Sequence, residues 1–323
     1  MLDQSGCGAN GLRKAACKSC PEGMPKSRIA IRETTRRRGD FFTGNDFYIV
    51  PALSFDKNRW VIKILFLGDV VGEPGRVAAC RTAELYLERG DADFIVVNGE
   101  NAANGRGITP KLAIDLMRSG IAVITSGDHI WDQKEIYPFL STEPRLLRPI
   151  NYPAGTPGGG SIVLDTVHGP IAVMNVQCRT FMGNPLENPF LAASAEVERL
   201  HQETRVIVVD VHGETTSEKI AMGRHLDGLV SLVVGTHTHV QTADERIFPK
   251  GTAFLCDAGM CGPEDSVLGR DYETVVERFV TSMPSKLPVA RGPIMACGVL
   301  VEVNPENGRS TAIRRVVERY GAI

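Results

Sequence analysis

The sequence predicts an α/β fold built on a mostly mixed sheet. Several short runs rich in Val and Ile are closed by glycine or polar residues, which is typical of buried strands. Segments with helical signals lie between several of these runs, and this alternation favours layers with helices on both faces of a sheet. The expected strands lie within residues 61–72, 92–101, 120–129, 205–214, 229–239, 253–257 and 295–303.

The segments between the strands carry signals for helices and for one hairpin. Thr109 and Pro110 form an N-cap followed by proline at the first helical position. Asn188 and Pro189 open a second such segment. The other expected elements are helices at residues 74–89 and 217–226 and a hairpin at residues 161–176.

The composition is that of an ordinary globular chain, and 323 residues suffice for one large domain or two small ones. A net charge of −2 argues against a protein that mainly coats nucleic acid. No run of about 18 apolar residues occurs, so neither a transmembrane helix nor a membrane partner is expected. The start of the chain lacks a basic region followed by an apolar run, so we expect a cytoplasmic protein whose eight cysteines are mostly thiols.

Residues 1–60 differ from the rest of the chain in charge and in patterning. They carry 11 Lys and Arg against 6 Asp and Glu, and they show no sustained apolar period. We therefore expect a disordered N-terminal extension at residues 1–60 and a folded domain at residues 61–323. Cys17 and Cys20 form a CxxC motif in the extension, but the further ligands or βαβ context of a zinc or redox site are not nearby.

Five of the expected strands end in residue types that bind metals or exchange protons. In open α/β sheets, ligand sites lie at the carboxyl ends of the strands, so side chains distant in sequence converge there. Carboxylates, an amide oxygen and imidazoles are oxygen and nitrogen ligands for divalent iron, manganese or zinc. The residues are Asp69, then Glu100 and Asn101, then Asp128 and His129, then His212, and finally His237 and His239.

The spacing of His237 and His239 strengthens this pattern. Two residues apart on an extended segment, both rings would lie on the same side and could face one cluster. A single histidine at a strand end is more often packed or exposed than a ligand. A whole set of charged groups without a partner would be costly to bury, however. Together these residues predict a metal site, and no site for an organic cofactor is predicted.

Other polar residues have competing interpretations. Asp210 precedes His212 by two positions, so it either orients the His212 ring through a hydrogen bond or caps a turn. His168 is interpreted as a hairpin-turn residue, His201 as a helix-surface residue and His225 as a structural residue of a helix.

From about residue 63 to residue 319, the chain resembles the bacterial YmdB-like metallophosphoesterases, a branch of the calcineurin-like phosphoesterase superfamily. The wider superfamily opens with an Asp-x-His motif, whereas Asp69-Val70-Val71 lacks that histidine, as this branch generally does. The matching motifs are GDVVGEPGR, VNGENAANGRGIT, TSGDHIWD, VDVHGETTSEK, VGTHTHVQTAD and DAGMCGPEDSVLG.

This resemblance implies a four-layer α/β/β/α sandwich that carries two divalent metal ions, with iron as the first expectation and manganese or zinc as alternatives. Glu100 would bridge the two ions, and His129 would lie beside them as the acid for the leaving group. The implied ligands are Asp69, Glu100, Asn101 and His239 for one ion, and Glu100, Asp128, His212 and His237 for the other.

The resemblance also implies the reaction. Family members hydrolyse phosphodiesters, usually 2′,3′-cyclic nucleotides, and often form homo-oligomers, which we therefore expect here. A metal-bridging hydroxide would attack the phosphorus while His129 protonates the leaving oxygen. The alternative is a metal-dependent regulatory protein that binds a nucleotide or RNA with little turnover.

One position departs from the family pattern. The family usually has Asn where this chain has Asp128 in the sequence Gly127-Asp128-His129. An aspartate can still bind a cation through oxygen, but it adds a negative charge. We expect it to hold the cations harder and to weaken their pull on a substrate phosphate, shifting metal preference or lowering turnover.

Overall fold

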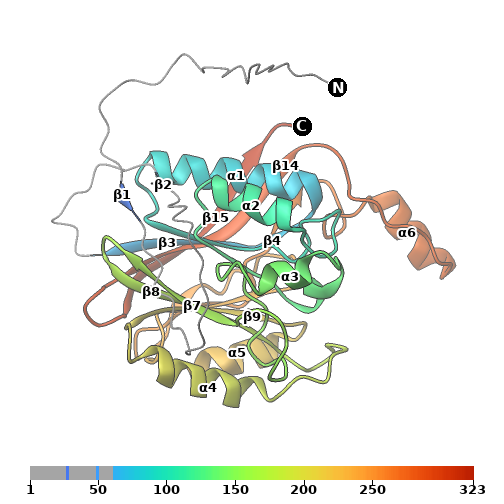
Figure 1. Ribbon diagram of the computed structural model, residues 1–323. Helices are drawn as coiled ribbons and strands as arrows, with labels where there is room; N and C mark the ends of the chain where they lie inside the picture. Colours follow the sequence, from blue (N-terminus) through green and yellow to red (C-terminus); the bar gives the residue numbers. More distant parts are fainter. Residues whose placement is uncertain (1–26, 29–48, 51–60) are drawn as a thin grey trace, which may run out of the picture.

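The computed structural model describes the backbone of residues 27–28 and 49–50 and the whole of residues 61–323 (Figure 1). β1 (Ser27–Arg28) and β2 (Ile49–Val50) pair in an antiparallel ladder. The remainder of the predicted extension, including the CxxC motif, lies outside the described residues. The division of the chain at residue 60 therefore stays a prediction.

One sheet has seven strands that run in mixed directions. They are β3 (Ile62–Leu67), β4 (Asp69–Val70), β5 (Phe94–Asn98), β6 (Val123–Thr125), β13 (Met260–Pro263), β14 (Ile294–Val303) and β15 (Ser310–Tyr320). The order across the sheet is β4–β13–β14–β3–β5–β6, and β15 pairs with β14. β3, β5 and β6 are parallel, whereas β14 runs antiparallel to β3.

The second sheet has six strands, and it too is mixed. They are β7 (Ser161–Thr166), β8 (Gly169–Gln177), β9 (Val206–His212), β10 (Leu232–Thr236), β11 (Arg246–Ile247) and β12 (Ala253–Leu255). The order is β11–β12–β10–β9–β8–β7. β7 and β8 form the predicted hairpin, and β8, β9, β10 and β12 are parallel neighbours.

Helices cover the outer faces of both sheets (Figure 1). The helices are α1 (Gly72–Glu88), α2 (Pro110–Arg118), α3 (Ile136–Leu140), α4 (Pro189–Leu200), α5 (Thr216–His225) and α6 (Tyr272–Thr281), with a short 3₁₀ helix, η1, at Asp128–Trp131. α1 and α2 lie over the seven-stranded sheet, the two sheets face each other, and α4 and α5 lie under the six-stranded sheet. The predicted α/β class with mixed sheets is confirmed.

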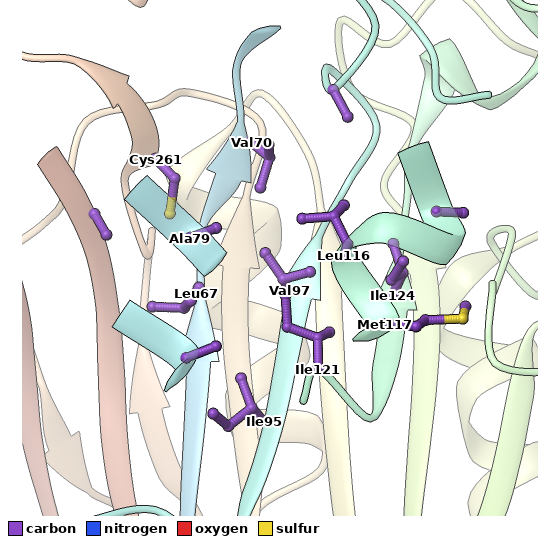
Figure 2. Packing of buried hydrophobic residues seen from close by; sticks show 14 of the residues in the cluster. Leu67, Val70, Ala79, Ile95, Val97, Leu116, Met117, Ile121, Ile124 and Cys261 are labelled. Atoms are coloured by element: carbon purple, nitrogen blue, oxygen red, sulfur yellow. The ribbon is translucent and has the colours of Figure 1, made fainter. Parts of the chain in front are cut away.

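The core explains why the strands appear as continuous apolar runs. In β3, Leu65 and Leu67 pack beneath α1 and α2, as Figure 2 shows for Leu67, while Ile64 and Phe66 face the other sheet. Side chains alternate between the two faces of a strand, so a strand covered on both faces is apolar at every position. All four of these side chains are fully buried.

The predicted starts of α2 and α4 are confirmed, but several elements were missed, namely β11, β13, β15, α3, η1 and α6. Thr109 accepts a hydrogen bond from the backbone N–H of α2, and Asn188 does the same at the start of α4, each with proline at the first helical position. β15 escaped prediction because its charged residues interrupt any apolar pattern, yet it pairs with β14 along its length. α6 also lacked a recognised signal.

Two further observations concern membrane-spanning helices and the state of the cysteines. Among the helices of the described chain, none combines the length and the apolar character needed to cross a membrane. In the same part of the chain, Cys80, Cys178, Cys256, Cys261 and Cys297 are free thiols.

Candidate metal centre

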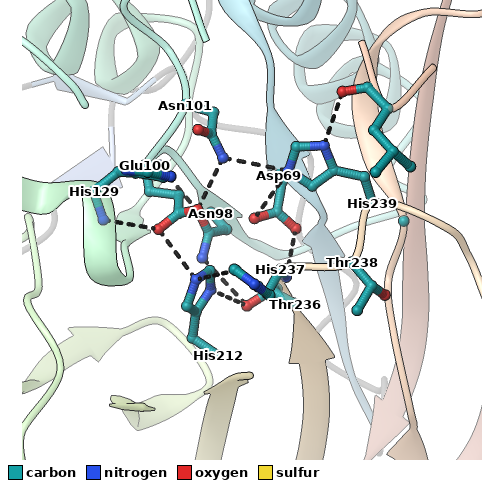
Figure 3. A network of polar contacts seen from close by, with 12 residues as sticks. Asp69, Asn98, Glu100, Asn101, His129, His212, Thr236, His237, Thr238 and His239 are labelled. Atoms are coloured by element: carbon teal, nitrogen blue, oxygen red, sulfur yellow. Dashed lines mark hydrogen bonds and ion pairs between the residues drawn. The ribbon is translucent and has the colours of Figure 1, made fainter. Parts of the chain in front are cut away.

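The residues that follow the predicted strands converge at one edge of the two sheets (Figure 3). The seven-stranded sheet contributes one group of them and the six-stranded sheet the other, because parallel strands of both sheets end at this edge. Asp69 begins β4, Glu100 and Asn101 follow β5, and Asp128 and His129 begin η1 after β6; His212 ends β9, and His237 and His239 follow β10.

Glu100, Asp128, His212 and His237 form the first cluster. The His212 Nε2 atom lies 3.2 Å from Glu100 Oε2, 3.1 Å from Asp128 Oδ1 and 3.1 Å from His237 Nδ1. One ligand atom from each residue falls within 4.8 Å of all the others, so the cluster could hold a metal ion. Glu100 and His212 are buried, whereas the side chains of Asp128 and His237 keep 25% and 21% of their exposure, so the cluster opens to solvent on their side.

Asp69, Asn101 and His239 form a second group on the other side of Glu100. Asn101 Nδ2 lies 2.9 Å from Glu100 Oε1 and 3.3 Å from His239 Nε2, and Asp69 Oδ1 lies 3.9 Å from the same ring nitrogen. A half-turn of the Asn101 amide would put its oxygen in the place of its nitrogen. Asp69 Oδ1 is buried and has no hydrogen-bond partner among the described residues.

His129 lies beside the first cluster rather than within it. Its Nδ1 is 3.0 Å from Asp132 Oδ2, and its Nε2 is 3.8 Å from Asp128 Oδ2. Arg106 also pairs with Asp132, at 2.8 Å between Nε and Oδ2. The His129 ring is therefore held at the solvent side of the centre, with 27% of the side chain exposed.

The carboxylates of the centre have strongly displaced pKa values. Burial, together with the nearby charges of Asp128 and Asp69, raises the pKa of Glu100 well above its ordinary value. Burial and the charge of Asp257 do the same to the pKa of Asp69. Burial alone would raise the pKa of Asp128 as well, but its interactions with His212, His129 and His237 outweigh that effect, and the pKa lies below its usual value.

Burial favours the neutral form of His212, His237 and His239. Burial lowers the pKa of His212 to about 4, and it also lowers the pKa values of His237 and His239. The neutral imidazole is the form that binds a metal ion. The three rings therefore have the protonation state that a metal centre needs.

The prediction that His237 and His239 lie on an extended segment is wrong. Both residues lie beyond the end of β10 and have left-handed backbone angles, with φ of 98° and 64°. Asp257 stabilises this turn by accepting hydrogen bonds from Thr238 N (3.2 Å) and Thr238 Oγ1 (2.7 Å). Fully buried Lys219 pairs with Asp257 at 2.8 Å. The turn sends the two rings to different groups, His237 to the first cluster and His239 to the second.

Several residues near the centre were missed or left open by sequence reasoning. Asp210 lies within β9 and accepts a hydrogen bond from Thr236 Oγ1 at 2.7 Å, so the turn-capping alternative is wrong. Asn98, at the end of β5, donates to Asp210 at 3.0 Å. Glu214 Oε2 lies 3.1 Å from His237 Nε2. Asp210 and Glu214 have a sequence signal, since each lies two positions from His212, whereas Asn98 has none.

The other histidines have structural contacts away from the centre. His168 lies in the turn between β7 and β8, as expected. His201 Nε2 lies 2.7 Å from the Leu229 carbonyl oxygen, and His225 Nε2 lies 2.7 Å from Ser194 Oγ on α4. The position of His168 and the contact of His225 agree with their predicted roles, and His201 lies at the C-cap of α4.

Comparisons with known proteins identify the family of the chain. The family model described as YmdB-like protein matches residues 65–316. A 2′,3′-cyclic-nucleotide 2′-phosphodiesterase of Bacillus subtilis (strain 168) is 44% identical over 256 residues, covering 79% of this chain and 97% of the relative.

Solved structures show the same similarity. The crystal structure of a hypothetical protein from Thermus thermophilus has a TM-score of 0.74 and 38% identity, covering 80% of this chain and 99% of that one. The crystal structure of a novel phosphatase from Mycoplasma pneumoniae has a TM-score of 0.75 and 33% identity, covering 81% and 94%. Since the family model spans most of the chain and these relatives are matched over nearly their full lengths, the chain belongs to the YmdB-like protein family.

Proposed function

We propose that this chain is a phosphodiesterase that works with two divalent metal ions and hydrolyses 2′,3′-cyclic nucleotides. The observation that carries the proposal is the convergence of carboxylate, amide and imidazole side chains at one edge of the two sheets, with four donor atoms within 4.8 Å. The substrate class is supported by the relative from Bacillus subtilis, which is named for that activity and is 44% identical.

The first ion would be held by Glu100, Asp128, His212 and His237. The lone pair of a neutral His212 Nε2 would face two carboxylate oxygens, Glu100 Oε2 at 3.2 Å and Asp128 Oδ1 at 3.1 Å. Acceptors that face one another in a buried place repel unless a cation or proton lies between them. The mixed oxygen and nitrogen donors suit iron, which we propose first, and also manganese or zinc.

The second ion would be held by Asp69, Asn101, His239 and the other oxygen of Glu100. Asp69 Oδ1 is buried without a hydrogen bond among the described residues, and such an atom is costly unless a cation satisfies it. Glu100 presents Oε2 to His212 and Oε1 to Asn101, so one carboxylate reaches both groups. This arrangement supports Glu100 as the bridging ligand.

When bound, two divalent ions would supply an activated water and neutralise charge on the phosphodiester oxygens. The residues of the chain would place the substrate and the proton. Asp128 and His237 mark the solvent side from which a phosphodiester would approach. Asp132, 3.0 Å from Nδ1 of His129, would accept a hydrogen bond from a doubly protonated ring, whose Nε2–H at this side of the centre could give its proton to the leaving oxygen.

Asp128 favours a second candidate function. Its added negative charge lies 3.1 Å from His212 Nε2 and would weaken the pull of the cations on a phosphate. On this alternative the centre binds a nucleotide or an RNA end as a regulatory protein with little turnover. A cytoplasmic location, a homo-oligomeric state and RNA as a partner stay predictions.

The test uses the full-length chain supplied with iron, manganese or zinc. Hydrolysis of 2′,3′-cyclic AMP and of bis-p-nitrophenyl phosphate is measured before and after removal of the metal by a chelator. We expect hydrolysis to depend on the metal. We also expect His225→Ala to leave hydrolysis unchanged, because His225 is hydrogen-bonded to Ser194 away from the centre. A metal-loaded chain that binds nucleotide but hydrolyses neither compound would favour the regulatory alternative.

A further inference from the structure

A buried polar chain links the two sheets beneath the metal centre. Asp210 and His212 lie two residues apart on β9 and share one face, and Thr236 on β10 is the register partner of His212. In the other sheet, Asn98 on β5 is the register partner of Thr125 on β6. All five side chains are fully buried. None of them except His212 belongs to the proposed set of metal ligands.

The Asp210 carboxylate accepts hydrogen bonds from three of these side chains. Thr236 Oγ1 donates to Oδ1 at 2.7 Å, and Asn98 Nδ2 donates to Oδ2 at 3.0 Å. Thr125 Oγ1 also donates to Oδ2. Three donors on its two oxygens are the pattern of an ionised carboxylate, which has no hydrogen of its own to give. Burial raises the pKa of Asp210 to about 7, so the ionised form prevails above that pH.

The hydrogen bond between Thr236 and His212 can then be donated only by His212. Thr236 Oγ1 lies 2.9 Å from His212 Nδ1. A hydroxyl carries one hydrogen, and that of Thr236 is already donated to Asp210, so toward His212 the oxygen can only accept. The hydrogen in this contact must therefore sit on Nδ1 of the imidazole. A neutral imidazole carries a single hydrogen, which leaves Nε2 with its lone pair.

We infer that Asp210, acting through the hydroxyl of Thr236, sets the tautomer of His212 and thereby turns the Nε2 lone pair toward the metal centre. Nε2 is the atom that lies 3.2 Å from Glu100 Oε2 (Figure 3) and 3.1 Å from Asp128 Oδ1. Asp210 and Thr236 are thus positioning residues that never contact the ion. The opposite tautomer would place a hydrogen where the ion must bind.

The same carboxylate also positions a ligand of the other sheet. Asn98 donates to Asp210 through Nδ2, and its Oδ1 accepts a hydrogen bond from the backbone N–H of Glu100 at 3.1 Å. Asp210 therefore ties His212 through Thr236 and Glu100 through Asn98. This second link explains how one buried residue keeps ligands from two different sheets in register.

The tautomer can be tested without any metal. In the metal-free, ¹⁵N-labelled full-length chain at about pH 8, where an ordinary histidine is neutral, long-range ¹H–¹⁵N correlation distinguishes a protonated from an unprotonated ring nitrogen. The His212 signals are identified by their loss in His212→Gln. We expect a protonated Nδ1 and an unprotonated Nε2 in the wild-type chain. A protonated Nε2 in the wild-type chain would overturn the inference. This result does not depend on whether the variants described next fold.

Variants distinguish the hydrogen-bond relay from Asp210 through Thr236 to His212 from a general effect of packing. Thr236→Val removes the hydroxyl and should mix the tautomers of His212, whereas Thr236→Ser should keep the wild-type spectrum. The matched control is Thr252→Val, because Thr252 is also fully buried and its hydroxyl donates to the Val230 carbonyl, away from His212. An unchanged His212 in Thr236→Val, or an equal change in Thr252→Val, would overturn the relay.

The consequence for metal binding rests on the proposed function, and it is measured separately. Titration with Mn²⁺ should show about 10–100-fold weaker binding for Thr236→Val, the size typical of a lost partner behind a metal ligand, with Thr236→Ser close to wild type. Equal affinity in Thr236→Val and wild type would overturn the positioning role. A wild-type chain with the expected tautomer that binds no Mn²⁺, Fe²⁺ or Zn²⁺ would instead contradict the proposed function and leave the relay standing.

Discussion

The Oδ1 atom of Asp69 lies 3.9 Å from Nε2 of His239, and this buried carboxylate oxygen has no hydrogen bond within the described residues. The two residues come from β4 of one sheet and from the turn after β10 of the other. Burial of an unsatisfied carboxylate oxygen is costly, and a divalent cation between the two residues would remove that cost. This relationship is the structural basis for the second of the two proposed ions.

Replacing His129 should separate catalysis from metal binding. His129→Ala is expected to keep both ions, because its ring lies outside the first cluster, at 3.8 Å from Asp128 Oδ2. Turnover should fall by about 10²–10⁴, the range of a lost general acid. Metal content is measured alongside the rate of hydrolysis of 2′,3′-cyclic AMP. Loss of an ion together with activity would show that His129 is a ligand instead.

Replacing Asp128 tests the departure from the family pattern. Asp128→Asn removes one negative charge next to His212 Nε2 but keeps an oxygen that can bind a cation. We expect weaker metal retention and faster turnover per loaded chain, since the cations would pull harder on the phosphate. The control is Asp115→Asn, at an exposed pair with Lys111. If Asp128→Asn changes neither metal content nor rate, the charge of Asp128 has no such role.

Metal uptake should release protons. In the metal-free chain, burial raises the pKa values of Glu100 and Asp69, so these carboxyls hold protons at a pH where exposed ones are ionised. A bound cation requires the ionised form, so it lowers both pKa values and displaces the protons. Metal affinity should therefore rise as the pH rises through the raised pKa values, and fall as the pH drops.

The histidines should contribute little to this release near neutral pH. The pKa of His212 is lowered to about 4, so its ring is already neutral there. Titration calorimetry in buffers of different ionisation enthalpy counts the protons, and Asp69→Asn should release fewer than the wild-type chain. Metal binding whose affinity does not vary with pH would refute the link to these carboxyls.

The buried pair of Lys219 and Asp257 should stabilise both the fold and the histidine turn. The two groups are 2.8 Å apart with exposures of 0% and 1%. Lys219→Met would leave the Asp257 carboxylate buried without its cation, which typically costs about 3–5 kcal/mol in the free energy of unfolding. Urea denaturation measures this loss. Lys111→Met, in an exposed pair with Asp115, should cost at most about 1 kcal/mol. Similar losses in the two variants would contradict this account.

The strands and the residues at their ends could be predicted from the sequence because both depend on local patterns. A run such as that of β3 is apolar at every position since both of its faces are covered, and the polar residue after it marks the strand end. The convergence of Asp69, Glu100 and His212 follows from the rule that parallel strands end at a common edge. The resemblance to a known family then supplied the pairing of residues with ions.

Among the supporting residues, Asp210 could be anticipated from its spacing to His212, but its partners could not be predicted, because they depend on which strands become neighbours. Asn98 meets Asp210 only when the two sheets face each other, and Thr236 meets His212 only in the register of β9 with β10. The turn at His237 and His239 has positive φ angles, which depend on contacts with Asp257. No pattern around any one of these residues contains that information.

The most direct test of the central claim is the metal content of the full-length chain and of His239→Ala. After loading with iron, manganese or zinc, we predict about two ions per wild-type chain, as in two-metal hydrolytic centres, and about one per chain of His239→Ala. Hydrolysis of 2′,3′-cyclic AMP should fall with the lost ion, while His225→Ala keeps both ions and the activity. One ion per wild-type chain, or an unchanged content in His239→Ala, would contradict a dinuclear centre built from both sheets.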